Sequence, residues 1–268
     1  SWCLFRGSQS RRLSVIIFAA WPTASVFKSN NNVARWQSAG YKVAVATDLP
    51  RTAIKAIDAS VPPLIIKKYE GYYRCMNALT KALVMTYRAD IVVCAGDGIH
   101  PPAYKAHDLA AAFAAKFNNG FGVMQPVQGS WHSERTQAGT QPWSQHRMHQ
   151  TRPTHERCES PWLGRTFIME ANSGMGPYCE KYDQYFGDHE LHDVAREMGC
   201  LWKQPNLCQP NQHWSKTGGP DIADYQVKNF ERSYEKDWAT YRARRDSQFP
   251  AAVVADMGLG ANIGRIIT

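Results

Sequence analysis

Residues 13–20 have the sequence LSVIIFAA, and residues 42–47 have the sequence KVAVAT. Continuous apolar runs of this length are typical of strands buried on both faces of a parallel sheet. Between them, residues 24–39 carry apolar side chains near helical spacing, and Gly40 follows as a helix stop. PLIIK (63–67) and DIVVCA (90–95) predict two more strands, separated by an amphipathic helix at 72–87. The first hundred residues therefore predict βαβ units and a largely parallel sheet.

The second half of the chain predicts more of the same pattern, with one interruption. We expect a helix at 104–117, strands at 122–127 and 165–170, and a helix at 188–198. Residues 129–162 are polar and irregular, which predicts a long insertion loop. A charged helix is predicted at 221–246, within a C-terminal helical extension (221–268) that packs on the main domain (1–220). The expected fold class is thus α/β, a mostly parallel sheet flanked by helices.

Composition limits the class of protein. The chain has 268 residues, 44% of them hydrophobic, which suits one large α/β domain. No apolar run approaches the roughly 18–20 residues that span a bilayer. A net charge of +8 favours polyanionic partners such as nucleic acid or nucleotide phosphates. Seven cysteines without a CxxC pair indicate neither a disulfide framework nor a zinc ribbon, which favours a reducing cytoplasm. Cys75 and Cys94 lie in apolar runs and are predicted core residues.

The most informative segment is residues 91–102, IVVCAGDGIHPP. Asp97 follows an apolar strand and is flanked by Gly96 and Gly98. Open α/β sheets bind ligands at the carboxyl ends of their strands. A carboxylate there can hold Mg²⁺ or Mn²⁺ on a diphosphate. The alternative interpretation is that Asp97 caps a turn.

Two further segments carry candidate residues. In FGDHELHDVAREMG (186–199), Asp188 is predicted to cap the helix, and Asp188 or Glu190 could act as a general base. Acidic residues in a first helical turn also simply complement the helix dipole. The segment LCQPNQHW (207–214) contains a single histidine, His213. A lone histidine is more often structural than a metal ligand, so His213 is a candidate ligand only in combination with Asp97.

The order of these features resembles the GT-A glycosyltransferases, in particular the large inverting family that includes many bacterial polysaccharide enzymes. The resemblance covers residues 13–215 and implies a Rossmann-like GT-A domain. That family's first motif is usually Asp-x-Asp, and Ala95-Gly96-Asp97 lacks the first acid. Asp188 matches the family's base, with Glu190 as second choice. His213 matches a late metal ligand, and Asp48 the acid that contacts the donor's base.

The resemblance implies an inverting hexosyltransferase that uses a nucleotide-sugar donor, most simply a UDP-sugar. Asp97 and His213 would hold Mn²⁺ or Mg²⁺ on the donor diphosphate, and Asp48, Gly96 and Gly98 would help bind the donor. Asp188 would deprotonate the acceptor hydroxyl as it attacks the anomeric carbon. Because Ala95 replaces the first acid, a metal-independent variant stays open.

The insertion loop suggests the acceptor. Trp131, Arg135, Trp143, Arg147 and Trp162 combine cations that suit phosphates with rings that suit unstacked bases. Some phage enzymes with GT-A-like domains glycosylate hydroxymethylated pyrimidines in DNA, and this compact basic chain is similar to them in size and character. DNA carrying a 5-hydroxymethyl pyrimidine is therefore the predicted acceptor, in a host cytoplasm if the chain is phage-encoded. A lid that grips the donor or a sugar acceptor is the alternative for this loop.

Two other classes of protein stay open. One is a GT-A enzyme that acts on a glycan or a lipid-linked sugar and ignores DNA. The other is a nucleotidyltransferase or a nucleotide-binding module without sugar transfer. The sugar, the donor base and the oligomeric state have no signature in the sequence.

Overall fold

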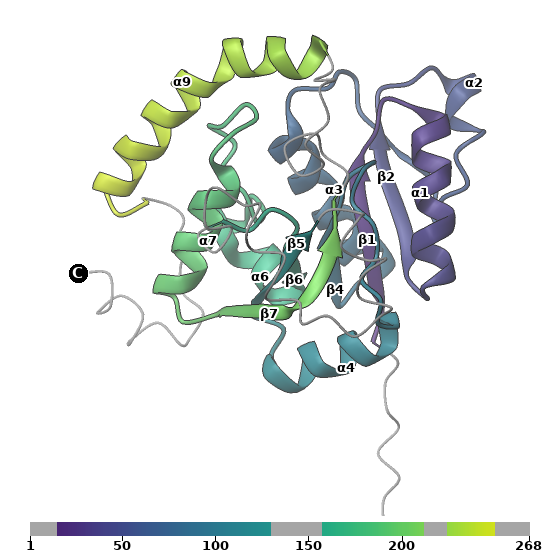
Figure 1. The fold of residues 1–268 in the computed structure, drawn as a ribbon, viewed down its shortest axis with the longest axis horizontal. Helices are drawn as coiled ribbons and strands as arrows, with labels where there is room; N and C mark the ends of the chain where they lie inside the picture. The colour runs from purple at the N-terminus through teal and green to yellow at the C-terminus, as the bar shows by residue number, and fades with distance from the viewer. Residues whose placement is uncertain (1–14, 130–156, 212–223, 250–268) are drawn as a thin grey trace, which may run out of the picture.

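The computed structural model describes residues 15–129, 157–211 and 224–249 (Figure 1). Seven strands form one sheet in the order β3-β2-β1-β4-β6-β5-β7. Their bounds are β1 (Ile17–Pro22), β2 (Lys42–Thr47), β3 (Leu64–Ile65), β4 (Ile91–Cys94), β5 (Val123–Gly129), β6 (Trp162–Gly164) and β7 (Leu201–Pro210). Strands predicted at 42–47, 63–67, 90–95 and 122–127 are all present, with ends that differ by up to two residues.

The sheet is mostly parallel, as the sequence predicted. β1 pairs in parallel with β2 on one side and with β4 on the other. β3 and β7 also lie parallel to their neighbours β2 and β5. Only β6 is antiparallel, to both β4 and β5. Because β6 reverses direction between them, β4, β5 and β7 all point the same way.

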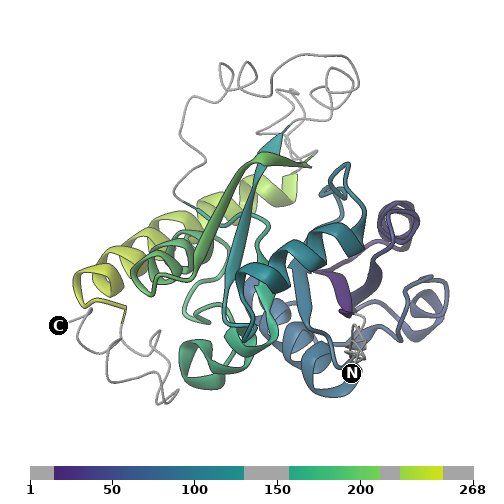
Figure 2. The same cartoon turned by 90° about the horizontal axis from the view of Figure 1, so that it is seen from below.

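Helices cover both faces of the sheet (Figures 1 and 2). One face carries α1 (Val26–Ser38) and α4 (Ala106–Lys116), and the other carries α3 (Tyr72–Tyr87), α6 (Arg165–Glu170) and α7 (Gly187–Glu197), with α9 (Asp224–Asp246) beyond α7. The short helices α2 (Arg51–Ile54) and η3 (Ala171–Gly174) complete the set. Along β1, Phe18 and Ala20 face the α3 side, whereas Ala19 and Trp21 face the α1 side. This alternation explains why β1 is apolar at every position.

The prediction of a strand at residues 165–170 is wrong, because these residues form the helix α6. The preceding strand, β6, ends at Gly164. Phe167 and Ile168 are both buried in the same cluster on the α3 side. Consecutive side chains of a strand point to opposite faces, so only a helical turn places both on one side. Tertiary packing here overrides the β propensity of Thr, Phe and Ile.

The long helix α9 packs against α7 through buried polar contacts. Arg244 donates from Nε to Oε2 of Glu190 (2.8 Å) and from a terminal nitrogen to Oε1 (2.6 Å), and both side chains are buried. The Tyr241 hydroxyl bonds to Oδ2 of Asp193 at 2.5 Å. These contacts join the C-terminal helix to the α/β sheet, while a domain boundary at residue 220 stays a prediction. Within the described ranges, no helix is long and apolar enough to cross a membrane.

We expect Arg244→Ala to lower the free energy of unfolding by about 3–5 kcal/mol, because it leaves the Glu190 carboxylate buried without its counter-charge. Urea denaturation followed by circular dichroism measures this cost. Arg245→Ala is the control, since Arg245 is half-exposed and lies over the Tyr241 ring at the surface. Its cost should stay below about 1 kcal/mol. Equal costs for the two variants would contradict a structural role for the buried pair.

Candidate nucleotide-binding and catalytic site

The site lies where the strand order reverses. From β1 the chain passes to β2 and β3 on one side, and then returns to β4 on the other side of β1. Open α/β sheets bind ligands in the crevice outside the carboxyl ends of the strands at such a point. Thr23 follows β1 and Asp97 follows β4, so both lie at this end of the sheet.

Asp97 is held by two donors from the end of β1. Trp21 Nε1 donates to Oδ1 at 2.9 Å, and the Thr23 hydroxyl bonds to Oδ2 at 3.0 Å. Burial raises the pKa of Asp97 above its ordinary value, although these two bonds and the charge of Lys28 act in the opposite direction. Lys28 lies in the first turn of α1. The carboxylate is therefore fixed in direction and partly desolvated, which favours interaction with a cation.

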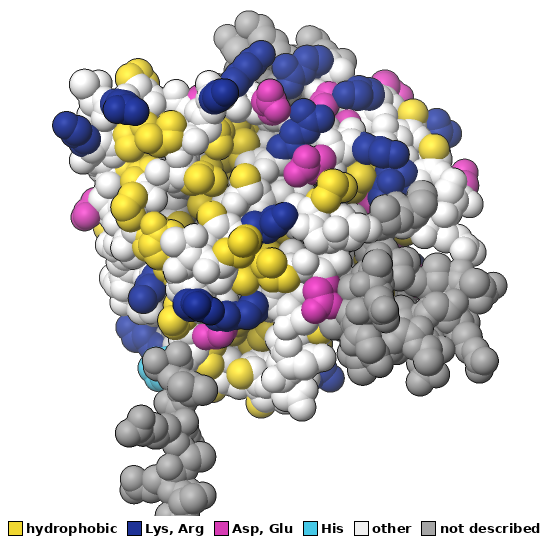
Figure 3. Space-filling view, turned by 180° about the vertical axis from the view of Figure 1, so that it is seen from behind, with side chains coloured by type: hydrophobic (Ala, Val, Ile, Leu, Met, Phe, Trp, Pro, Cys, Tyr) yellow, Lys and Arg dark blue, Asp and Glu magenta, His cyan; other side chains and the backbone are white. Residues whose placement is uncertain are grey.

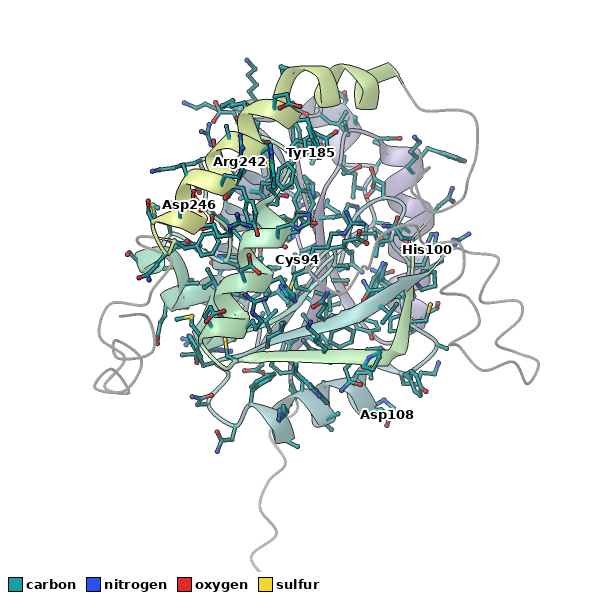
Figure 4. All side chains as sticks on the ribbon, turned by 60° about the vertical axis from the view of Figure 1, so that its left-hand side comes forward. Cys94, His100, Asp108, Tyr185, Arg242 and Asp246 are labelled. Atoms are coloured by element: carbon teal, nitrogen blue, oxygen red, sulfur yellow. The ribbon has the colours of Figure 1, made fainter. Side chains whose placement is uncertain are left out.

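The loop that carries Asp97 is fixed by side chains of α1. Asn32 Nδ2 donates to the carbonyls of Gly96 (2.7 Å) and Ile99 (2.9 Å), and Trp36 Nε1 also donates to Ile99 (2.9 Å). His100 is buried, with Nδ1 bonded to Asn32 Oδ1 at 2.9 Å. Figure 4 shows His100 to one side of Cys94, the last residue of β4. Side chains of α1 therefore hold this loop at several backbone positions.

The same loop meets the end of β7. The backbone N–H of His100 donates to the Pro210 carbonyl at 2.9 Å, and Ile99 forms an isolated bridge with Asn211. Asn211 ends the described segment that contains β7, so His213, the second predicted metal ligand, lies outside the described residues. Its role as a ligand stays a prediction.

Asp188 lies in the first turn of α7, but it is not the N-cap as predicted. Phe186 takes that position with a left-handed backbone (φ 65°), and the helix begins at Gly187. The half-buried Asp188 side chain accepts a hydrogen bond from the Tyr73 hydroxyl through Oδ1 at 3.4 Å. Its backbone carbonyl accepts from the N–H of Cys158 at 2.9 Å. The carboxylate is therefore free of the capping role and available for chemistry.

Glu190 cannot serve as the alternative base, which corrects the second choice made from sequence. Its side chain is 3% exposed, and Arg244 bonds to both carboxylate oxygens. The Tyr182 hydroxyl donates to Oε2 as well, at 2.6 Å. A carboxylate saturated in this way has no free oxygen for an acceptor hydroxyl. Among the acids proposed as base, only Asp188 fits the role.

Two tyrosines at the start of α3, which sequence reasoning missed, connect Asp97 with Asp188. The Tyr72 hydroxyl donates to the Ala95 carbonyl at 3.0 Å, two residues before Asp97. Its ring lies edge-on to Tyr73 with centroids 5.6 Å apart, and Tyr73 bonds to Asp188. The sequence signal for this pair is the doublet directly after Gly71, where a helix begins.

The segment before β6 closes the site on the side opposite α1. The Ser160 hydroxyl donates to the Cys94 carbonyl at 2.6 Å, at the end of β4. Two residues earlier, the Cys158 N–H bonds to the Asp188 carbonyl. The end of β4 and the start of α7 are therefore both bonded to one short segment. The Cys94 and Cys158 thiols are buried, and burial raises their pKa values, which leaves them unreactive.

Asp48 lies at the same edge of the sheet, directly after β2. It is exposed, and Oδ2 accepts from the backbone N–H of Tyr69 at 3.1 Å. At Gly96, a Cβ atom would come no closer than 3.5 Å to Ile99, so packing within the protein does not require glycine there. Both positions are compatible with donor binding, and their roles stay predictions.

The fit for a metal ion is incomplete in the described part of the chain. No group of three or more His, Cys, Asp and Glu side chains that could hold a metal lies within the described ranges. Asp97 supplies a single carboxylate. Mg²⁺ is commonly bound by one or two carboxylates together with substrate phosphates. Asp97 therefore fits an ion that takes most of its other ligands from a bound diphosphate.

Of the five residues predicted to contact the acceptor, one lies within the described ranges. Trp162, predicted to contact the acceptor, is fully buried in β6, where its indole N–H donates to Gln209 Oε1 at 3.0 Å. That prediction is wrong, because the Trp162 ring is part of the hydrophobic core and cannot reach an acceptor. Trp131, Arg135, Trp143 and Arg147 lie outside the described residues. On the face in Figure 3, the described Lys and Arg side chains are spread among acidic ones rather than gathered in one stripe.

Comparisons with known proteins give weak similarities. No protein-family model matches the sequence, and no curated protein does. Among solved structures, a mycobacterial protein is similar at 10% identity and a TM-score of 0.49, with 91% of this chain and 77% of that chain covered. Glucosyl-3-phosphoglycerate synthase from Mycobacterium tuberculosis, in complex with phosphoglyceric acid, is similar at 13% identity and a TM-score of 0.47, with 91% and 82% covered.

A cytidylyltransferase from Leptospira borgpetersenii is similar at 12% identity and a TM-score of 0.42, with 87% of this chain and 95% of that chain covered. With TM-scores below 0.5, these similarities assign neither a family nor an activity. The functional argument therefore rests on the site itself.

We expect Trp21→Phe to cost more stability than Trp36→Phe at neutral pH. Both indoles are fully buried and donate one hydrogen bond, Trp21 to the Asp97 carboxylate and Trp36 to a neutral carbonyl. A bond to a charged group contributes about 1.5–3 kcal/mol and a neutral one about 0.5–1.5 kcal/mol. Urea denaturation of the two variants measures the difference.

The extra cost of Trp21→Phe should also depend on pH. Its hydrogen bond favours the ionised form of Asp97, so the contribution is present above the pKa of Asp97 and is lost as the pH falls through it. Trp36→Phe should show a flat cost over the same range. A pH-independent cost for both variants would show that the Asp97 carboxylate gains nothing from Trp21.

Proposed function

We propose that this protein is a glycosyltransferase that moves a sugar from a nucleotide-diphosphate-sugar donor to a hydroxyl acceptor. One observation carries the proposal: two carboxylates, Asp97 and Asp188, lie at the carboxyl edge of the sheet beside the switch point. Asp97 is held by Trp21 and Thr23, and Asp188 is half-buried and accepts the Tyr73 hydroxyl through Oδ1. A nucleotidyltransferase needs a cation-binding carboxylate but has no evident use for Asp188.

In this proposal the donor lies across the ends of β1, β2 and β4. Asp48, after β2, contacts the nucleobase, and the first turn of α1 with Lys28 faces the phosphates. Helix N-termini and lysines are both common partners of phosphate groups. Asp97, with His213 as a further ligand, would hold Mn²⁺ or Mg²⁺, and the ion would supply positive charge toward the leaving diphosphate.

Asp188 acts as the general base. Tyr73 bonds to Oδ1, which leaves Oδ2 to accept the proton of the acceptor hydroxyl. As that proton leaves, the hydroxyl oxygen attacks the anomeric carbon, and the bond from this carbon to the diphosphate breaks. A single displacement of this kind inverts the anomeric configuration.

The proposed acceptor is DNA that carries a 5-hydroxymethyl pyrimidine. Its support is the net charge of +8 and the Trp- and Arg-rich composition of residues 129–162. DNA binding carried by cations weakens steeply as salt rises, since bound counterions are released from the phosphates. A glycan or lipid-linked hydroxyl would show no such salt dependence.

The proposed function predicts that substitution of each carboxylate removes a different property of the protein. Asp97→Asn should abolish divalent-ion-dependent binding of the nucleoside diphosphate, measured by isothermal titration calorimetry. Asp188→Asn should keep that binding and lower sugar transfer by at least about 100-fold, the lower range for a general base. Asp108→Asn is the control, because Asp108 is exposed on α4 and lies away from Cys94 at the end of β4 (Figure 4).

The assay uses a panel of UDP- and GDP-sugars with Mn²⁺ or EDTA, with and without hydroxymethylpyrimidine DNA. Release of nucleoside diphosphate that increases with this DNA supports the acceptor. Release that is independent of DNA keeps the transferase and points to a glycan or lipid-linked acceptor. Formation of pyrophosphate identifies a nucleotidyltransferase instead, and no release from any donor would falsify the proposed function.

A further inference from the structure

Tyr73 contacts the start of α7 at two points through its hydroxyl. It is the second residue of α3 and is 4% exposed. Its hydroxyl lies 3.1 Å from the backbone nitrogen of Gly187 and 3.4 Å from Oδ1 of Asp188. One oxygen atom therefore contacts both the first backbone N–H of α7 and the proposed base.

Counting protons fixes the direction of these two bonds. A phenol has one O–H to donate and can also accept. The Gly187 N–H can only donate, so the tyrosine oxygen accepts from it. The single O–H of Tyr73 is then left for the Asp188 carboxylate. Burial raises the pKa of Tyr73 well above its ordinary value, so the hydroxyl keeps its proton throughout the working range.

Close packing holds the ring in place. A Cβ atom on Gly187 would lie 2.6 Å from Cζ of Tyr73, so the ring rests directly on the backbone at the start of α7. Gly71, two residues before Tyr73, has φ 108°, and a Cβ atom there would lie 2.3 Å from the Asp183 carbonyl oxygen. The start of α3 and residues 183–187 are therefore in backbone contact, which leaves the hydroxyl little freedom.

The far side of this segment is fixed by α9. The buried Asp237 carboxylate accepts backbone N–H groups from Asp183 (3.0 Å), Gln184 (2.8 Å) and Tyr185 (2.8 Å). Figure 4 places Tyr185 next to α9. Residues 183–187 are thus held between α3 and α9, and Asp188 follows them directly.

The other ionisable groups near Asp188 offer it no comparable donor. Tyr72, also on α3, directs its hydroxyl to the Ala95 carbonyl. The Cys158 thiol, from the segment before β6, is buried, and its pKa is raised by that burial and by Asp188. On α7, His192 is one turn further along and its Nδ1 faces Asp193 at 3.4 Å. The Tyr73 hydroxyl is the donor that the described residues direct at the Asp188 side chain.

We propose that Tyr73 is a positioning residue for the Asp188 base. Its hydroxyl holds Oδ1 and leaves Oδ2 for the acceptor hydroxyl. The inference rests on the proposed function for the role of Asp188 as the base. The contact between the two side chains does not depend on that role.

The test compares Tyr73→Phe with Tyr182→Phe. Tyr182 is the matched control, because its buried hydroxyl also donates to an α7 carboxylate, that of Glu190. Tyr73→Phe keeps the ring that packs on Gly187. NMR of ¹³C-labelled aspartate carboxylates, with Asp188 assigned from Asp188→Asn, reports the surroundings of that carboxylate without any assay of activity. Transfer kinetics, separated into kcat and the donor KM, give the second readout.

For Tyr73→Phe we expect the Asp188 carboxylate resonance to move, because the side chain loses its hydrogen-bond donor. The value of kcat should fall about tenfold with the donor KM unchanged. Tyr182→Phe should leave both the Asp188 resonance and kcat in place.

An unchanged Asp188 resonance in Tyr73→Phe overturns the inference. An equal change in both variants overturns it as well, since it would reflect general loosening of α7. If the wild-type chain transfers no sugar from any donor, the proposed function fails separately. The NMR comparison then still decides whether Tyr73 controls the Asp188 carboxylate.

Discussion

The structure depends on the burial of β1 between two parallel neighbours. β1 has helices over both faces, so its side chains are apolar at every position, and its hydrogen bonds are shared between β2 and β4. The chain reaches these neighbours on opposite sides of β1, so the carboxyl end of β1 lies at the point where open α/β sheets bind ligands. Trp21 and Thr23, at the end of this strand, are also the residues that hold Asp97. The same strand therefore organises the core and orients the candidate site.

The second half of the site is built differently. Residues 176–186 contain little regular structure, and side chains from two helices satisfy their backbone groups. Asn77 on α3 bonds to both the N–H and the carbonyl of Tyr178, at 2.9 and 2.7 Å. Asp237 on α9 accepts three further N–H groups. A segment held in this way can present Asp188 at a defined position without a strand or helix of its own, because each buried polar backbone group has a partner.

The two carboxylates of the first turn of α7 have different roles because their surroundings differ. Glu190 points into the core, where Arg244 neutralises it, and the pair joins α9 to α7. Asp188, two positions earlier, points to a different side of the helix, and within the described residues its carboxylate bonds to the hydroxyl of Tyr73. Positions two apart on a helix do not share a face, so one carboxylate stabilises the fold while its neighbour stays available for chemistry.

The sequence by itself determined the α/β class, most of the strands and helices, and the position of Asp97 after a central strand. These features follow from the periodicity of apolar residues, which depends on backbone geometry within one segment. Only the tertiary structure decided that residues 165–170 are helical, that Trp162 is core, that Glu190 is paired with Arg244 and that Tyr73 meets Asp188. The partners of Trp162, Glu190 and Tyr73 lie 47, 54 and 115 residues away in the chain. Contacts at such separations are fixed by how the elements pack together, and no local pattern encodes them.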